Sequence, residues 1–221
     1  MALELLPNII LNLFSFFAPI KGYKILKALY DLFKNYVTAL STGLFFYLTF
    51  NLWQEKFKAK NELSNILIEY KEMKKDVLEE MLLAESDPYG NPKIDELCEE
   101  LCLNPQAASD YFTEEIFFKT CENLDENRMR NIRFTLRLFL DDFHNAKNES
   151  LKNGSSSLAI VYKDIAYILQ KLTEEIPFYW EAEQSCPSNH PLYILFCYKN
   201  EKYPNKDIRY HLISEEYEKL S

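Results

Sequence analysis

Glycine and histidine are scarce in this chain, and their scarcity argues against several classes of site. The 221 residues include 4 glycines and 3 histidines. Loops that cradle phosphate need closely spaced glycines, and the sequence holds no such loop and no H-E-x-x-H, G-x-S-x-G or C-x-x-C motif. With so few glycines and only 9 prolines, a turn-dense β-sandwich or barrel is also disfavoured. The sequence indicates no cofactor and no convergent catalytic set.

Positive charge is in short supply and unevenly placed. The formal net charge is −9, from 25 basic and 34 acidic residues. This balance argues against DNA binding, which needs basic side chains for the phosphates. Residues 1–53 carry four lysines and two acidic residues and sum to +2, so the remainder sums to −11. The chain therefore divides into an apolar, slightly basic N-terminal quarter and an acidic remainder.

A long uncharged run lies within the N-terminal quarter. Between Lys34 and Glu55 no residue is charged, and twenty helical residues span about 30 Å, the thickness of a bilayer core. Aromatic rings stand near both ends, at Tyr36 and Trp53, where interfacial rings are common. This pattern predicts a transmembrane helix at 35–54 within a membrane-associated region 1–54. A buried core helix is the alternative, because serines, threonines and an asparagine dilute the run.

Two shorter features surround this run. Residues 5–20 are also uncharged but short for a membrane span, and whether they insert stays open. Tyr23, Leu26, Tyr30 and Phe33 recur at helical spacing with lysines off their stripe, which suggests either an amphipathic helix on an anionic membrane or a helix in a bundle. The five cysteines show no secreted-type spacing, so we expect a membrane protein whose acidic domain is cytoplasmic.

The remainder of the chain has the pattern of helices. Residues 55–85 lack glycine and proline and predict a long connector helix, either a short coiled coil or an ordinary amphipathic helix. Lys74 interrupts its apolar seam. The segment 86–92 breaks the helix, and an acidic domain is expected over 86–221. Residues 192–198 fit either a strand or a buried helical turn. Further helices are predicted over 93–102, 105–124, 127–147, 158–176 and 207–220.

One pair of residues suggests a catalytic alternative. Arg137 and His144 are separated by six residues on one predicted helix. The pair resembles the Arg-x4–6-His signature of the helical HEPN ribonucleases, which implies that the two side chains act on RNA phosphate and on proton transfer. Leu138 stands where that family usually has a polar residue. The other interpretation is a solvated charged face, in which Arg137 pairs with Asp141 one turn away.

A second group of residues suggests a metal site. Cys186, His190, Cys197 and His211 could bind zinc through two thiolates and two imidazoles. Their spacing matches no compact zinc finger. The alternative is a pair of buried cysteines and two unrelated histidines, and on that interpretation the chain has no metal ligands.

The order of segments resembles a family of bacterial membrane-anchored phage abortive-infection proteins. The matching stretches are 43–73, 132–143 and the helix leading into 176–180, which lie in an anchor, a helical connector and a helical domain. The resemblance implies a membrane-tethered effector of defence or stress. Residues 4–29 alone are similar to part of the eukaryotic tetratricopeptide-39/inclusion-body-clearance family, which would make the N-terminal quarter part of a soluble helical array.

Together these patterns predict an all-α protein with N-terminal membrane-associated helices, a long connector helix and a C-terminal bundle-like domain. The leading functional hypothesis is a membrane-tethered interaction or effector protein that is not an enzyme, with membrane lipid as a partner and a protein partner or homo-oligomer also open. The alternatives are a helical ribonuclease-like toxin and a soluble helical scaffold or complex subunit in which residues 1–53 are buried.

Overall fold

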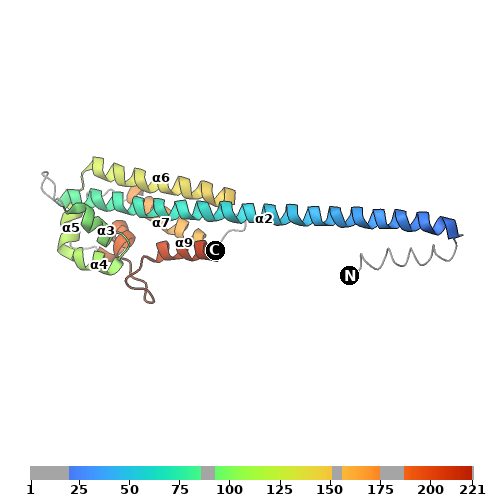
Figure 1. Ribbon diagram of the computed structural model, residues 1–221. Coiled ribbons are helices and arrows are strands. Elements are labelled where there is room, and N and C mark those ends of the chain that lie inside the picture. The colour runs from blue at the N-terminus through green and yellow to red at the C-terminus, as the bar shows by residue number, and fades with distance from the viewer. Residues whose placement is uncertain (1–19, 86–92, 151–155, 175–186, 221) are drawn as a thin grey trace. The chain divides into compact units, whose positions relative to one another are not determined.

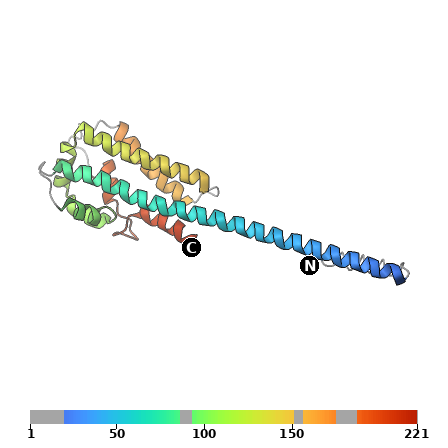
Figure 2. The same ribbon diagram turned by 45° about the horizontal axis from the view of Figure 1, so that its top comes forward.

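The computed structural model describes residues 20–85, 93–150, 156–174 and 187–220 and is all-α over them, as the sequence predicts (Figures 1 and 2). The uncharged run 5–20, the helix-breaking segment 86–92 and Cys186 lie outside the described residues, apart from Ile20 at the start of the first described helix. The elements in chain order are α2 Ile20–Glu85, α3 Ile94–Leu101, α4 Pro105–Tyr111, α5 Glu114–Asn123, α6 Glu126–Ser150, α7 Ser156–Glu174, the 3₁₀ turn η2 Pro187–Asn189, α8 Pro191–Cys197 and α9 Ile208–Lys219.

The chain divides into two units. The first is Met1–Glu55 and the second is Lys56–Ser221. The second unit contains nearly all of the predicted connector as well as the acidic domain. Helix α2 contributes residues to both units, and its side chains change character between them: large apolar residues are exposed in the first unit, whereas burial begins at Ala59 in the second.

The predicted transmembrane helix at 35–54 needs correction. Residues 35–54 are helical within α2, but no helix in the described part of the chain is both long enough and apolar enough to cross a bilayer. The reason lies in composition, because Asn35 and Asn51 and several serine, threonine and tyrosine residues lower the mean hydropathy of the run.

The seam of the predicted connector faces the core of the second unit. Leu63, Tyr70, Val77 and Met81 are at most 1% exposed. Contacts of Tyr70 reach α6, through Phe139, and α9, through Asp207. This seam is therefore occupied by the chain's own helices and is not free to form a coiled coil with another chain. The amphipathic-helix alternative describes α2 correctly in this unit.

The remaining helices complete that core. Helix α7 packs against α6, α8 and α9, and α8 also packs against α4. On α7 the buried side chains follow helical spacing, because one face of an amphipathic helix is covered. Their positions are Leu158, Val161, Ile165, Ile168 and Leu172.

Local capping explains two differences from the predicted elements. The helix expected over 105–124 is broken after Tyr111, because Thr113 accepts a hydrogen bond from the amide of Ile116 and starts a new helix, α5. The ambiguous segment 192–198 is helical. Pro191 occupies the first turn of α8 and His190 caps it, a pattern typical of a helix start.

Candidate functional site

Charged side chains are buried in the core of the second unit, where they form a connected group. Lys74 of α2 is 0% exposed, and Asp207 and Arg209 at the start of α9 are each 4% exposed. The phenol of Tyr70, also 0% exposed, completes the group. We call these four residues the core ion cluster. Buried charges are costly unless they are paired and hydrogen-bonded, so their partners decide what the cluster does.

Asp207 accepts hydrogen bonds from three directions. The Tyr70 hydroxyl donates to both carboxylate oxygens, at 3.1 and 3.0 Å, and the Lys74 ammonium donates to Oδ2. Oδ1 also accepts from the amides of Arg209 and Tyr210, at 2.9 and 3.3 Å. The carboxylate is therefore the N-cap of α9, where a negative charge is favoured by the exposed amides of the first turn.

The two cations of the cluster contact the C-terminal end of α8. Lys74 Nζ donates to the carbonyl of Leu195 at 3.0 Å, and Arg209 donates to the carbonyl of Ile194 at 3.5 Å. Both carbonyls belong to the last turn of α8, whose carbonyl groups lack partners within the helix. The cluster thus places positive charge at the C-terminus of α8 and negative charge at the N-terminus of α9, which stabilises both helix ends.

Burial and the neighbouring charges shift the pKa values of the cluster in different directions. Burial opposes ionisation of Asp207, but Lys74 and Arg209 outweigh it and hold the pKa of Asp207 below its ordinary value. Burial lowers the pKa of Lys74, and the Asp207 carboxylate opposes that shift. Burial and then Asp207 raise the pKa of Tyr70 well above 10, so its phenol remains a hydrogen-bond donor. The cluster therefore pairs buried charges and hydrogen-bonding groups in the core of the second unit.

A pocket of about 370 Å³ lies beside the cluster, between α7, α8 and α9. We call it the α7–α9 pocket. Arg209 contributes to its wall, and Asp164 of α7 lies at its margin with a side chain that is 45% exposed. Ile160, Tyr167 and Tyr198, each about half exposed, supply apolar surface to the pocket.

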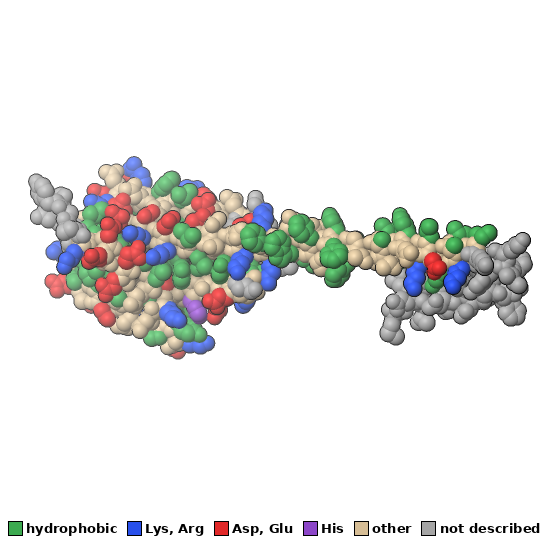
Figure 3. Space-filling model, viewed as in Figure 1, with side chains coloured by type: hydrophobic (Ala, Val, Ile, Leu, Met, Phe, Trp, Pro, Cys, Tyr) green, Lys and Arg blue, Asp and Glu red, His purple; other side chains and the backbone are tan. Residues whose placement is uncertain are grey.

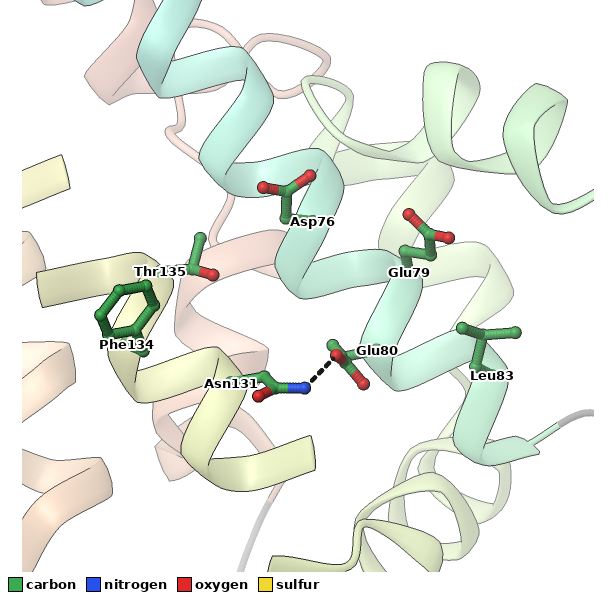
Figure 4. Close-up of a pocket in the computed structure, with 7 residues that line it drawn as sticks. All are labelled: Asp76, Glu79, Glu80, Leu83, Asn131, Phe134 and Thr135. Carbon is green, nitrogen blue, oxygen red and sulfur yellow. Dashed lines mark hydrogen bonds between the residues drawn. The ribbon is translucent and has the colours of Figure 1, made fainter. Parts of the chain in front are cut away.

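A second pocket, of about 340 Å³, is acidic (Figure 4). It lies between α2 and α6, with Asp76, Glu79 and Glu80 on one side and Phe134 on the other. Glu80 accepts hydrogen bonds from Asn131 at 2.7 Å and from Arg128 at 3.0 Å. Burial, and then the charge of a nearby glutamate, raise the pKa of Asp76. Among the described residues, here or elsewhere, no three or more His, Cys, Asp or Glu side chains are grouped so that they could hold a metal ion.

The residues of the ribonuclease hypothesis lie on the outer face of α6. Arg137 and His144 are both exposed, and the His144 ring lies 5.9 Å from the ring of Tyr162 on α7. The neighbouring arginine on the same helix, Arg133, donates to the carbonyl of Leu172 at 2.8 Å and so binds the last turn of α7. The catalytic role of the pair stays a prediction.

The proposed zinc ligands that are described serve other contacts. His190 Nδ1 accepts the amide of Leu192 at 3.1 Å, and Nε2 lies 3.9 Å from the sulfur of Cys121. His211 Nε2 is 3.2 Å from Glu215 on its own helix. Burial raises the pKa of Cys197 to about 12, so its thiol is far from the thiolate form that binds zinc. Cys186 lies outside the described residues.

The first unit carries a different kind of surface. From Ile25 to Trp53, most of the large apolar side chains on α2 are between 37% and 70% exposed (Figure 3). We call residues 25–53 the apolar segment. Ile25, Leu29, Phe33, Tyr36 and Leu40 follow one face of the helix, with the lysines of this stretch on the other side. From Leu44 to Trp53, apolar residues occur at nearly every position and therefore surround the helix.

The core ion cluster was not predicted from the sequence, although two of its residues carried a signal. Lys74 was visible as a charge inside an apolar seam, and Asp207 was the first residue of the helix predicted over 207–220 and is of a type that commonly caps a helix. These two signals, taken together, were the available indication of a buried pair.

Comparisons with protein-family models, with characterised proteins and with solved structures find no match to this chain. They give no support to the resemblance to the abortive-infection proteins, which stays a prediction.

Proposed function

We propose that this chain is a membrane-associated interaction protein. The apolar segment binds the surface and acyl region of a lipid bilayer, and the acidic second unit is available to a protein partner. The observation that carries the proposal is the exposure of the apolar segment: soluble proteins rarely expose apolar surface on this scale without a partner for it. A helix that crosses the bilayer is not part of this proposal.

The distribution of apolar side chains favours lipid over a second helix. A helix partner needs one apolar stripe, as in a coiled-coil seam. Between Leu44 and Trp53 the apolar residues surround the helix instead, which suits a surrounding solvent of acyl chains. The stretch before it, from Ile25 to Leu40, is one-sided and has Lys27 and Lys34 opposite its apolar face, as in helices that lie on anionic membranes.

The polar groups of the segment are compatible with an apolar environment. The hydroxyls of Thr38, Ser41 and Thr49 donate to backbone carbonyls four residues earlier, at 2.7 to 2.8 Å. A hydroxyl that is satisfied by its own helix costs much less to bury than an unpaired one. Tyr36 and Trp53 provide rings of the type found at membrane interfaces.

Vesicle flotation of the full chain tests this proposal. Wild-type protein should float with phosphatidylcholine vesicles that contain phosphatidylglycerol. Phe46→Asp places an unpaired charge in the apolar segment and should greatly reduce flotation, because burying such a charge among acyl chains is costly. Phe134→Asp is the matched control, because Phe134 is 66% exposed and Phe46 is 65% exposed. It should float like the wild type.

A different set of results would contradict the membrane proposal. If the wild type stays at the bottom of the gradient and light scattering shows a defined oligomer that Phe46→Asp dissociates, the apolar segment binds a second copy and the membrane proposal is wrong. The scaffold hypothesis would then account better for the exposed surface.

A further inference from the structure

We infer that the α7–α9 pocket is a binding site for a small organic carboxylate with an apolar body, a role independent of membrane association. The pocket lies entirely in the second unit and has a volume of about 370 Å³. That size is in the range of sites for small molecules, which combine a mostly apolar lining with a few placed polar groups.

The polar recognition group is the guanidinium of Arg209. The residue is 4% exposed, and its Nε forms no hydrogen bond in the described structure. Besides its interaction with Tyr70, the guanidinium makes two long contacts: Nε lies 3.4 Å from Asp164 Oδ2, and the donor to the Ile194 carbonyl lies 3.5 Å from it. Charge-assisted hydrogen bonds to arginine are typically about 2.7–2.9 Å long. The guanidinium group of Arg209 is therefore held in place without the short, bidentate contact with a carboxylate that arginine favours.

The charge balance explains why the expected ligand is an anion. Within the core ion cluster, the negative charge of Asp207 is paired directly with Lys74. Arg209 also interacts with Asp207, and Asp164, 3.4 Å from its Nε, is the carboxylate outside the cluster that it contacts. Because the Asp164 side chain is 45% exposed, it can turn toward solvent and leave its place to a ligand carboxylate. Asp164 then acts as an internal competitor for the site.

Apolar surface beside this group accounts for the body of the ligand. Ile160 and Tyr167 lie on one face of α7, with Asp164 between them at helical spacing. Tyr198 follows α8, and its ring centroid is 5.9 Å from the guanidinium carbon of Arg209. A flat or short aliphatic body would cover these side chains while its carboxylate met Arg209.

Ligand-observed NMR titration of the full chain tests the site with 3-phenylpropionate and its neutral amide, 3-phenylpropionamide. The carboxylate should bind and the amide should bind much more weakly. Asp164→Asn removes the competing charge and should tighten carboxylate binding by roughly tenfold, because the ligand no longer has to displace the Asp164 carboxylate from Arg209. If Asp164 served only to hold the fold, this variant would weaken binding or leave it unchanged.

Substitution of the buried Arg209 risks unfolding the protein, so a second pair of variants tests the pocket without changing Arg209. Ile160→Glu puts a carboxylate at the pocket and should abolish binding, and exposed Ile68 on α2 supplies the control Ile68→Glu, which should bind normally. Equal binding of the amide, no gain with Asp164→Asn, or no loss with Ile160→Glu would each overturn the inference.

Discussion

Lys74 and Asp207 are 133 positions apart in the sequence and form a direct ion pair in the core of the second unit. Neither side chain is more than 2% exposed. Lys74 comes from the C-terminal part of α2, and Asp207 caps the first turn of α9. The pair therefore joins two helices that are distant in sequence, and the same groups also hydrogen-bond the C-terminal end of α8 and the N-terminal end of α9.

Breaking this pair should be costly, and neutralising both partners should be less so. Lys74→Met leaves a buried carboxylate without its cation and should lower the free energy of unfolding by about 3–5 kcal/mol. In the double variant Lys74→Met/Asp207→Asn both charges of the direct pair are removed, Arg209 keeps Asp164 as its acidic partner, and asparagine can still cap α9. We expect the double variant to be more stable than Lys74→Met alone, as measured by urea unfolding followed by circular dichroism. A double variant no more stable than Lys74→Met would show that the ion pair does not set the stability of this core.

His190 should make stability depend on mildly acidic pH. Burial lowers the pKa of His190 from 6.5 to about 4. Its Nε2 lies 3.9 Å from the thiol of Cys121, whose pKa burial raises to about 12. Since the unfolded chain binds the proton first, the stabilisation is complete above pH 6.5 and is lost as the pH falls toward 4. The loss amounts to up to about 3 kcal/mol.

The matched variant is His190→Asn, which keeps an N-cap acceptor for α8 but cannot titrate. Unfolding curves at a series of pH values should show the wild type losing stability relative to this variant between pH 6.5 and 4. Parallel curves over that interval would mean that His190 is not held neutral in the fold.

Two phenylalanines should differ sharply in their contribution to stability. Phe117 is 0% exposed and its ring contacts those of Phe112, His190 and Tyr193. Phe117→Ala should cost about 3–5 kcal/mol, because it removes buried surface and leaves a cavity. Phe134, which is 66% exposed, should change stability by no more than about 0.5 kcal/mol on replacement by alanine. Thermal and urea unfolding measure both, and similar losses would contradict the burial pattern.

The second unit should fold without the first. A fragment of residues 56–221 retains the buried residues of α2 from Ala59 onward. We expect it to unfold at the same urea concentration as the full chain and to remain at the bottom of the flotation gradient. An unfolded fragment would instead indicate that residues 1–55 stabilise the rest, as the scaffold hypothesis requires.

Local patterns in the sequence were enough to predict most helices. Apolar residues at helical spacing, and breaks at proline and glycine, predicted the helical class and the approximate bounds of α3, α6, α7 and α9. Capping was harder to see: Thr113 divides one predicted helix into α4 and α5 by a single side-chain contact. The predicted membrane span was wrong because a run without charges is not necessarily apolar enough to cross a bilayer.

The sequence by itself determined the all-α class, the uneven distribution of charge and the apolar character of the N-terminal helix, because these follow from composition and from contacts within a few residues. Only the tertiary structure decided that the lysine in the seam of α2 is the partner of Asp207, and that Arg209 reaches a pocket beside Asp164. The physical reason is that burial makes a charge depend on its partner, and packing of distant segments selects that partner.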